Sequence, residues 1–109
     1  DVRALMVRNG DGDKQIAITE MGWTTDQVNP DYSWYAVTPE QQADYLVRAY
    51  QYAQAHWAPW IGMMFTIYIA DPDWTTANEQ YWWAITRPVP PGDPPEVLPA
   101  YAALKAMDK

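Results

Sequence analysis

Apolar residues are spaced along the chain in two ways, one typical of strands and one typical of helices. Residues 15–19 (Gln-Ile-Ala-Ile-Thr) predict a short buried strand that runs directly into Glu20. Alternation along this strand would put Ile16, Ile18 and Glu20 on one face, so a carboxylate is expected at the end of an apolar row. Residues 60–69 are almost entirely apolar and predict a second strand, covered on both faces as in a parallel sheet.

The segment between the two strands predicts one long helix that reaches Trp57. Thr38 is expected as its N-cap, Pro39 as its first residue and Gln41 as the residue that completes a capping box. Pro59 ends the helix. Apolar side chains recur at 3.6-residue spacing and predict one buried stripe, made of Ala43, Leu46, Ala49, Tyr50, Ala53 and Trp57.

Two shorter helices are expected at the ends of the chain. Residues 2–8 are typical of the tail of a helix, with Leu5 and Met6 as apolar contacts, and Asn9-Gly10 stops it. Residues 98–107 predict a closing helix, and its inward side chains are expected to be Tyr101, Leu104 and Met107.

The connecting segments are expected to be loops. Residues 24–37 and 70–74 are polar and each follows a strand, while residues 88–99 hold six of the ten prolines, too many for a helix or a central strand. The order helix, strand, helix, strand, helix indicates an α/β fold with right-handed crossovers. Two parallel strands cannot bury both faces by themselves, so we expect the chain to belong to a larger sheet that begins upstream.

Charge and composition exclude several classes of partner. Seven Lys and Arg against fourteen Asp and Glu give a formal charge of −7, which argues against nucleic acid and anionic membranes as partners. No run approaches the ~20 apolar residues of a spanning helix, and no cationic-then-apolar leader opens the chain. Without cysteine, neither a disulfide nor a thiolate metal site is expected. The one imidazole, His56, falls in the last turn of the long helix, where it suits the helix dipole better than catalysis.

The aromatic composition is unusual, because the chain has seven Trp and eight Tyr but a single Phe. Tyr and Trp carry polar groups that need partners, so packing alone would favour Phe. Flat rings with polar rims suit sugars, although the same rings can fill helix–sheet interfaces.

Glu20 stands at the C-terminal end of a strand, the position from which active groups project in α/β barrels. The second strand is expected to deliver Tyr68, Asp71 and Trp74 to the same rim. A carboxylate surrounded by aromatic rings and short acids suits glycoside hydrolysis, because the oxocarbenium-like transition state needs a nearby anion. A solvated or ion-paired glutamate is the alternative.

Residues 18–23, Ile-Thr-Glu-Met-Gly-Trp, resemble the seventh-strand motif of clan A glycoside hydrolases. The helix start at 38–43, the apolar strand 61–69, and the segments 78–85 and 98–104 are similar to the rest of such a barrel's closing part. The resemblance covers nearly the whole chain but only the last quarter of the barrel. It implies that residues 1–109 are one partial domain of a (β/α)₈ barrel, comprising the end of a helix, strand seven, helix seven, strand eight and helix eight.

The resemblance also implies roles for individual residues. Glu20 matches the nucleophile of a double-displacement, configuration-retaining mechanism acting on O-glycosidic bonds of plant or microbial β-glycans. Trp23 matches the motif's tryptophan, which is either a loop anchor or a sugar platform. Clan members commonly place a Trp near the end of the eighth strand, where this chain has Thr66. The sequence does not choose among Phe65, Tyr68 and Trp74 as a substitute for that ring. The predicted substrate-binding residues are Trp23, from the motif, and Tyr68, Asp71 and Trp74, from the rim after the second strand.

The clan's acid/base glutamate lies on the fourth strand, and no segment of this chain matches it. Glu40 belongs to a helix start, Glu79 to a different loop, and Glu96 to the proline-rich segment. A retaining site needs two carboxylates about 5–5.5 Å apart, so we expect that the chain alone does not turn over glycosides. No metal or other cofactor is implied, since the reaction uses only water.

Three interpretations follow. The chain is part of a complete hydrolase, a non-catalytic glycan-binding module that uses Trp23, Tyr68 and Trp74, or a structural piece that completes a barrel by association. In each case the uncovered strands are expected to pack against the remainder of a barrel or another copy. The family's habit of export implies a secreted protein. The glycan, and whether cleavage is exo or endo, depend on loops after strands that this chain does not contain.

Overall fold

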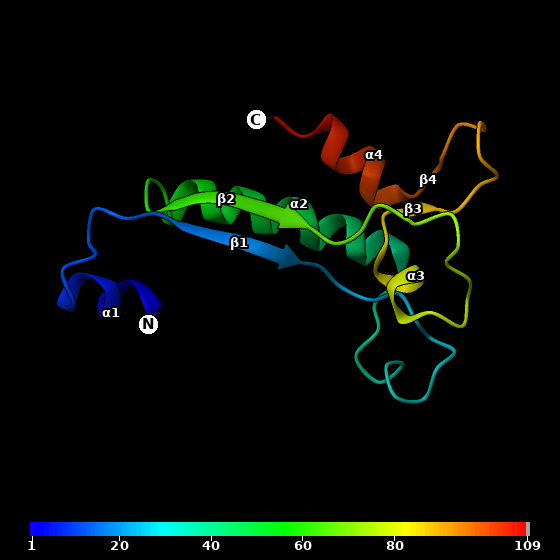
Figure 1. Ribbon diagram of the computed structural model, residues 1–109, viewed down its shortest axis with the longest axis horizontal. Coiled ribbons are helices and arrows are strands. Elements are labelled where there is room, and N and C mark those ends of the chain that lie inside the picture. The colour runs from blue at the N-terminus through cyan, green and yellow to red at the C-terminus, as the bar shows by residue number, and fades with distance from the viewer. Residues whose placement is uncertain (109) are drawn as a thin grey trace.

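The computed structural model describes residues 1–108. Its elements are α1 (Val2–Arg8), β1 (Ile16–Met21), α2 (Pro39–His56), β2 (Ile61–Thr66), α3 (Glu79–Trp83), β3 (Thr86–Arg87), β4 (Glu96–Val97) and α4 (Pro99–Ala106). In Figure 1, β1 and β2 lie side by side with α2 along them, and both strands point toward the end where α3 and the β3–β4 pair lie. None of the helices formed by these residues is long and apolar enough to cross a membrane.

The two long strands form a parallel sheet, which confirms the predicted α/β class and strand direction. Ile16 pairs with Ile61 and Met21 pairs with Thr66. The connection between them is α2, as the alternation of strand, helix and strand predicts. The sheet has two strands among residues 1–108 and does not close into a barrel.

An irregularity in β1 changes the direction of Glu20. Ile18 and Met21 are three positions apart along the chain, whereas their partners Met64 and Thr66 are only two positions apart. Such a bulge interrupts the alternation of side chains. Ile18 and Met21 are therefore both half-buried and Glu20 is exposed, so the predicted alternation does not extend as far as Glu20.

α2 begins and ends as its sequence predicts. The Thr38 side chain accepts a hydrogen bond from the Gln41 backbone at 3.1 Å, and the Gln41 side chain accepts one from the Thr38 backbone at 2.9 Å. Trp57 is the C-cap, and its N–H donates to the carbonyl of Ala53. The predicted stripe is confirmed: its members are buried or half-buried.

The core lies between α2 and α4 rather than around the sheet. Its buried members are Ala43, Leu46, Ile85 and Ala100, and the half-buried Met21, Trp23, Tyr101, Ala103 and Leu104 pack against them. The inward direction predicted for Tyr101 and Leu104 is confirmed. α4 begins one residue later than expected, because Leu98 is its N-cap and Pro99 its first residue.

One face of the sheet is uncovered. Met63 on β2 is 57% exposed and Phe65 is 50% exposed, so the expectation that β2 is covered on both faces is wrong for these residues. α1 has the predicted bounds, with Gly10 after it at a φ of +82°, but it buries no residue and Leu5 is half exposed. The α1 segment is held instead by Arg3, whose guanidinium donates to the carbonyl of Gly12 at 2.6 Å.

The uncovered surfaces make the chain extended for its length. Its radius of gyration is 16.2 Å, whereas a compact domain of this size has about 13 Å. It exposes 7299 Å², whereas a compact monomer of the same mass exposes about 6,200 Å². Roughly 1,100 Å² of additional surface is therefore exposed, mostly because nothing packs on α1 or on the open face of the sheet.

Three short elements were not predicted from the sequence. α3 is a single turn, Glu79–Trp83, and the side chain of its N-cap, Asn78, does not cap it. The antiparallel strands β3 and β4 bracket the proline-rich segment, with Thr86 opposite Val97. Elements this short have too few residues to show a helical or strand period.

Candidate functional site

The segments that follow β1 and β2 approach each other closely at Gly22. A Cβ atom on this residue would lie 3.1 Å from the Ile67 carbonyl oxygen and 3.5 Å from the Trp83 ring. The Ile67 N–H donates to the carbonyl of Met21 at 3.0 Å, which continues the pairing beyond the strand. Glycine therefore allows the segment with Tyr68 to pass beside the end of β1, next to Glu20.

Glu20 lines a cavity of about 280 Å³ at this end of the sheet. The other lining residues are Ile67, Tyr68, Glu79, Gln80 and Trp83. Two of the six are carboxylates and none is cationic, so the cavity favours a neutral ligand or a developing positive charge. Within residues 1–108 the ion pairs are Lys14–Asp11 and Arg48–Asp44, so Glu20 is not neutralised by a partner.

Backbone carbonyls of α3 hold the walls of this cavity together. Thr25, just after the strand-end motif, donates to the Trp82 carbonyl from its N–H at 3.0 Å and from its hydroxyl at 2.9 Å. Gln42 of α2 is 1% exposed, and its amide donates to the carbonyls of Trp23 at 2.8 Å and Trp83 at 3.2 Å. α3 is thus fixed against both the end of β1 and the start of α2.

The structure brings some of the predicted substrate-binding residues together. Tyr68 lines the cavity with Glu20, and the Trp74 ring packs edge-on against Tyr68 with centroids 5.3 Å apart. Asp71 is exposed in the loop before Trp74, where its carboxylate accepts a hydrogen bond from the Asp73 N–H at 2.9 Å. Thr66, at the position where clan members have Trp, donates to the Met21 carbonyl and offers no ring.

Trp23 does not line the cavity that Glu20 shares with Tyr68. It packs against the core between α2 and α4, and its ring meets the edge of Tyr45 at 5.5 Å. Together with Glu20 and Tyr52 it borders a second, more apolar depression of about 400 Å³ on the α2 side of the sheet. These contacts favour the loop-anchor interpretation of Trp23 over the sugar platform.

Several residues of the site had no clear signal in the sequence. Glu79 and Trp83 line the cavity, and the Trp83 indole donates to the Glu79 carboxylate at 3.1 Å.

Thr24 and Asp26 are each 1% exposed, within a segment predicted as a polar and aromatic loop. Asp26 accepts hydrogen bonds from the N–H groups of the two residues that begin the turn, Val28 and Asn29. A short polar residue at the start of a turn is the one local indication.

The loop between β1 and α2 brings Tyr32 near Glu79 of α3. The negative charge of the Glu79 carboxylate raises the pKa of the Tyr32 hydroxyl above its ordinary value of 10.0, with a smaller contribution from Asp31. This interaction connects a loop after the first strand to the cavity wall formed by α3.

Replacing Glu79 with Gln is expected to lower the pKa of Tyr32 toward 10.0, because the neighbouring negative charge that disfavours the phenolate is removed. The titration of the Tyr32 ring carbon by NMR measures this. Asp31→Asn is the matched control and is expected to give a smaller decrease. An unchanged Tyr32 titration in the Glu79 variant would contradict the proximity of the two side chains.

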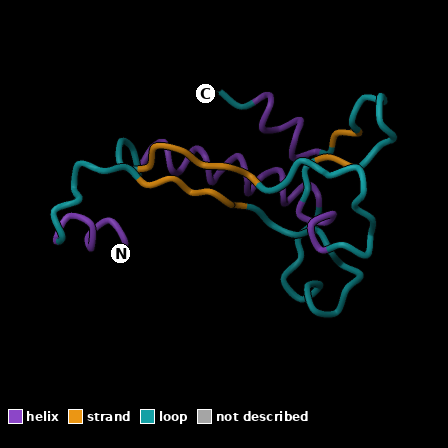
Figure 2. The backbone as a smooth tube through the Cα atoms, in the orientation of Figure 1, coloured by secondary structure: helices purple, strands orange, loops and turns teal. Residues whose placement is uncertain are grey.

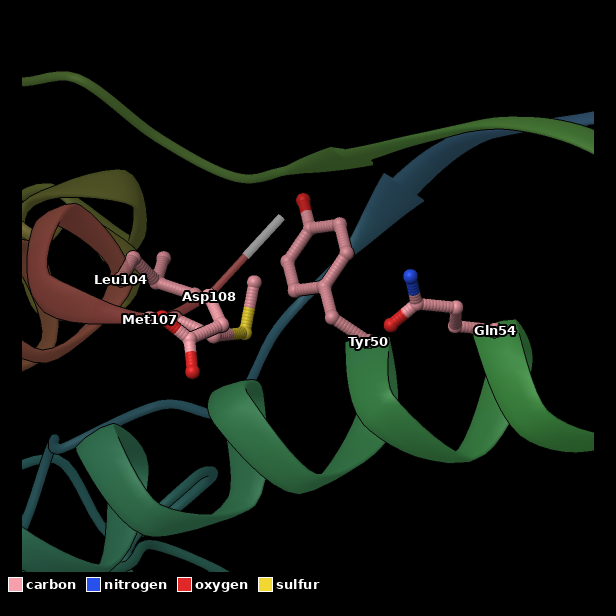
Figure 3. Close-up of a pocket in the computed structure, with 5 residues that line it drawn as sticks. All are labelled: Tyr50, Gln54, Leu104, Met107 and Asp108. Atoms are coloured by element: carbon pink, nitrogen blue, oxygen red, sulfur yellow. The ribbon is translucent and has the colours of Figure 1, made fainter.

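A different cavity, of about 360 Å³, lies between α2 and α4 (Figure 3). Tyr50, Leu104 and Met107 surround it, and Gln54 and Asp108 stand at its edge. The Tyr50 hydroxyl points toward the sheet and donates to the Met64 carbonyl at 3.2 Å, and burial raises the pKa of Tyr50. This cavity is mainly apolar and lies away from Glu20, so it is not the candidate active site.

Residues 1–108 contain no group of three or more His, Cys, Asp or Glu side chains that could hold a metal ion. No protein-family model, curated protein or solved structure matches the chain. The candidate site therefore stands on its own geometry and on the resemblance of its strand-end motif.

Proposed function

We propose that this chain is part of a retaining glycoside hydrolase and supplies its nucleophile, Glu20. The observation that carries the proposal is the position of Glu20: an exposed carboxylate, without a cationic partner among residues 1–108, at the C-terminal end of a parallel strand and beside Tyr68 and Trp83. The cavity around it lacks positive charge, which suits a transition state with positive charge on the sugar. The strand-end motif at 18–23 gives independent support.

In the proposed reaction a Glu20 carboxylate oxygen attacks the anomeric carbon. The carbon–oxygen bond to the leaving group breaks, and the leaving oxygen takes the electron pair together with a proton from an acid. Water then attacks the glycosyl ester, gives its proton to the same group, and Glu20 leaves as the carboxylate. Glu79 and Gln80 face the same cavity and are suited to bind sugar hydroxyls, while the acid/base group lies on a segment outside this chain.

The proposal includes completion of the sheet by further parallel strands, as in a (β/α)₈ barrel. The open face with Met63 and Phe65 is the side on which such strands would enclose a core. Loops after both strands lie at one end, together with α3 (Figure 2), as an active-site face requires. In the absence of the other strands, a second copy of the chain is the proposed partner of this face.

The test separates the nucleophile from the missing acid. A 2,4-dinitrophenyl 2-deoxy-2-fluoro-β-glycoside needs no protonation of its leaving group, and the fluorine slows hydrolysis of the ester, so the adduct accumulates. We expect the glucoside or xyloside probe to add one glycosyl group to Glu20, observed as an intact-mass increase and located by peptide mapping. Ordinary alkyl glycosides, which need the acid, are expected to show no saturable hydrolysis by the chain.

Glu20→Gln is expected to abolish the adduct, whereas Glu96→Gln, which changes an exposed glutamate on β4, is expected to leave it unchanged. An adduct at another residue, or none with either probe, would contradict the nucleophile assignment. Saturable hydrolysis of an alkyl glycoside by the pure chain would contradict the claim that its acid/base group lies elsewhere.

A further inference from the structure

Trp34, at the tip of the loop between β1 and α2, is 80% exposed and has the most exposed side chain among the large apolar residues of the described chain. A single exposed aromatic residue needs no explanation. Trp34 is different because its ring is held in place: the indole N–H donates to the Asp31 carbonyl at 3.2 Å. The ring also packs edge-on against Tyr35, with centroids 4.7 Å apart and planes at 78°. Most of the Trp34 side chain is left open to solvent.

The loop that carries Trp34 is itself fixed. Its two ends are joined by the hydrogen bond from the Val37 N–H to the Thr24 carbonyl at 2.9 Å. Inside, the buried Asp26 holds the start of the turn, and the Asn29 carbonyl accepts from the Ser33 N–H at 2.9 Å. A ring held in this way loses little conformational entropy when a ligand packs on it.

The tip lies at the same end of the sheet as the cavity that contains Glu20. Tyr32 packs against Tyr35 with ring centroids 6.4 Å apart, and it lies close enough to Glu79 for that carboxylate to raise its pKa. Glu79 in turn lines the cavity. Figure 1 shows this loop at the same end of the sheet as α3. We therefore expect a ligand longer than one ring, leaving the cavity at this end of the sheet, to reach the loop that carries Trp34.

The chemistry around the tip selects the kind of ligand. A flat aromatic face with a hydroxyl and carbonyl groups at its edge suits the C–H face and hydroxyl rim of a sugar ring. The nearby carboxylates of Asp31 and Glu79, in a chain of formal charge −7, disfavour anionic glycans and phosphate groups. We propose that Trp34, supported by Tyr35, is a platform that binds a neutral sugar unit of a glycan extending out of the Glu20 cavity.

The claim that the bound glycan is cleaved at Glu20 rests on the proposed function. The claim that Trp34 binds a sugar unit does not. Titration of the chain with cellohexaose and with xylohexaose, followed by tryptophan fluorescence and calorimetry, tests the platform. We expect one of these neutral hexasaccharides to bind and Trp34→Ala to weaken that binding on the order of tenfold or more. Trp34→Phe is expected to retain most of it. Hexagalacturonic acid, an anionic glycan of equal length, is expected not to bind.

Val28→Ala is the matched control, because Val28 is 75% exposed in the same loop and lies outside the platform. It is expected to bind as the unaltered chain does, with unchanged circular dichroism. Equal affinity of the Trp34→Ala variant, or no binding of either neutral hexasaccharide, would overturn the inference. If Trp34→Ala weakens binding while Glu20 is not labelled, the platform stands and the proposed function fails. If Glu20 is labelled while Trp34→Ala binds as tightly as the unaltered chain, the proposed function stands and the platform fails.

Discussion

A chain in which Met63 and Phe65 are both replaced by Lys is expected to be a monomer, whereas the unaltered chain is expected to self-associate. The two side chains are 57% and 50% exposed on the open face of the sheet, at alternate positions of β2. Exposed apolar strands attract other chains, and lysine on a strand opposes such pairing. Sedimentation velocity and light scattering, over a range of concentrations, measure the change.

The area available is sufficient for this association. A standard interface buries about 800 Å² on each partner, and the chain exposes roughly 1,100 Å² more than a compact monomer of its mass. Val2 and Val7 of α1, which are 64% and 56% exposed, lie on a second uncovered surface. The open face of the sheet is the better candidate, because its exposed side chains come from a strand that backbone pairing holds against β1.

Val97→Lys is the control for the added charge, since Val97 is 48% exposed on β4, away from the open face. It is expected to leave association unchanged. If the unaltered chain stayed monomeric at high concentration, the prediction would be contradicted, and a second copy of the chain would not be the partner of the open face. If Val97→Lys reduced association as much as the double replacement of Met63 and Phe65, net charge rather than the sheet face would control association.

The elements predicted correctly are those whose cause is local. α2 is specified by its capping box and by the spacing of its stripe, both of which lie within a few turns of one segment. β1 and β2 are specified by short apolar runs, although β2 ends at Thr66, three residues before the end of the predicted run at Ile69. These signals do not depend on what the chain packs against.

The features that could not be predicted depend on contacts between distant segments. The bulge before Met21 exists only in relation to the register of β2, and it decides where Glu20 points. Glu79 joins the cavity because α3 is bound to Thr25 through a carbonyl 57 residues away. The sequence therefore indicated Glu20 by its motif and its strand end, and Tyr68 by the second strand, but not Glu79, Gln80 and Trp83.

Gln42 is the clearest example of a residue whose role depends on distant segments. Among the replacements considered, Gln42→Glu is expected to lower the free energy of unfolding the most. Its amide is the donor for two carbonyls, those of Trp23 and Trp83, in a site that is 1% exposed. An ionised carboxylate there would face two oxygen atoms without a donor. Leaving a buried charge uncompensated costs about 3–5 kcal/mol, a large part of the stability of a small domain.

The loss should depend on pH. Burial without a donor raises the pKa of the introduced carboxyl above the unfolded value of about 4.3. The neutral acid, which can donate to one carbonyl, is the form that the folded state tolerates. The stability that the Gln42→Glu variant loses relative to the unaltered chain is therefore expected to be smallest below pH 4.3 and to grow as the pH rises through the folded pKa. Urea unfolding followed by circular dichroism at several pH values measures this.

The neighbouring glutamine provides the matched control. Gln41 is exposed and completes the capping box of α2, a position at which glutamate serves equally well, so Gln41→Glu is expected to unfold at the same urea concentration as the unaltered chain. Because Gln42 fixes the end of β1 to α3, its replacement is also expected to abolish labelling of Glu20 at neutral pH, whereas Gln41→Glu retains it. Equal stability of the two variants at neutral pH would mean that the Gln42 amide does not hold these segments together, and the cavity wall opposite Glu20 would need another support.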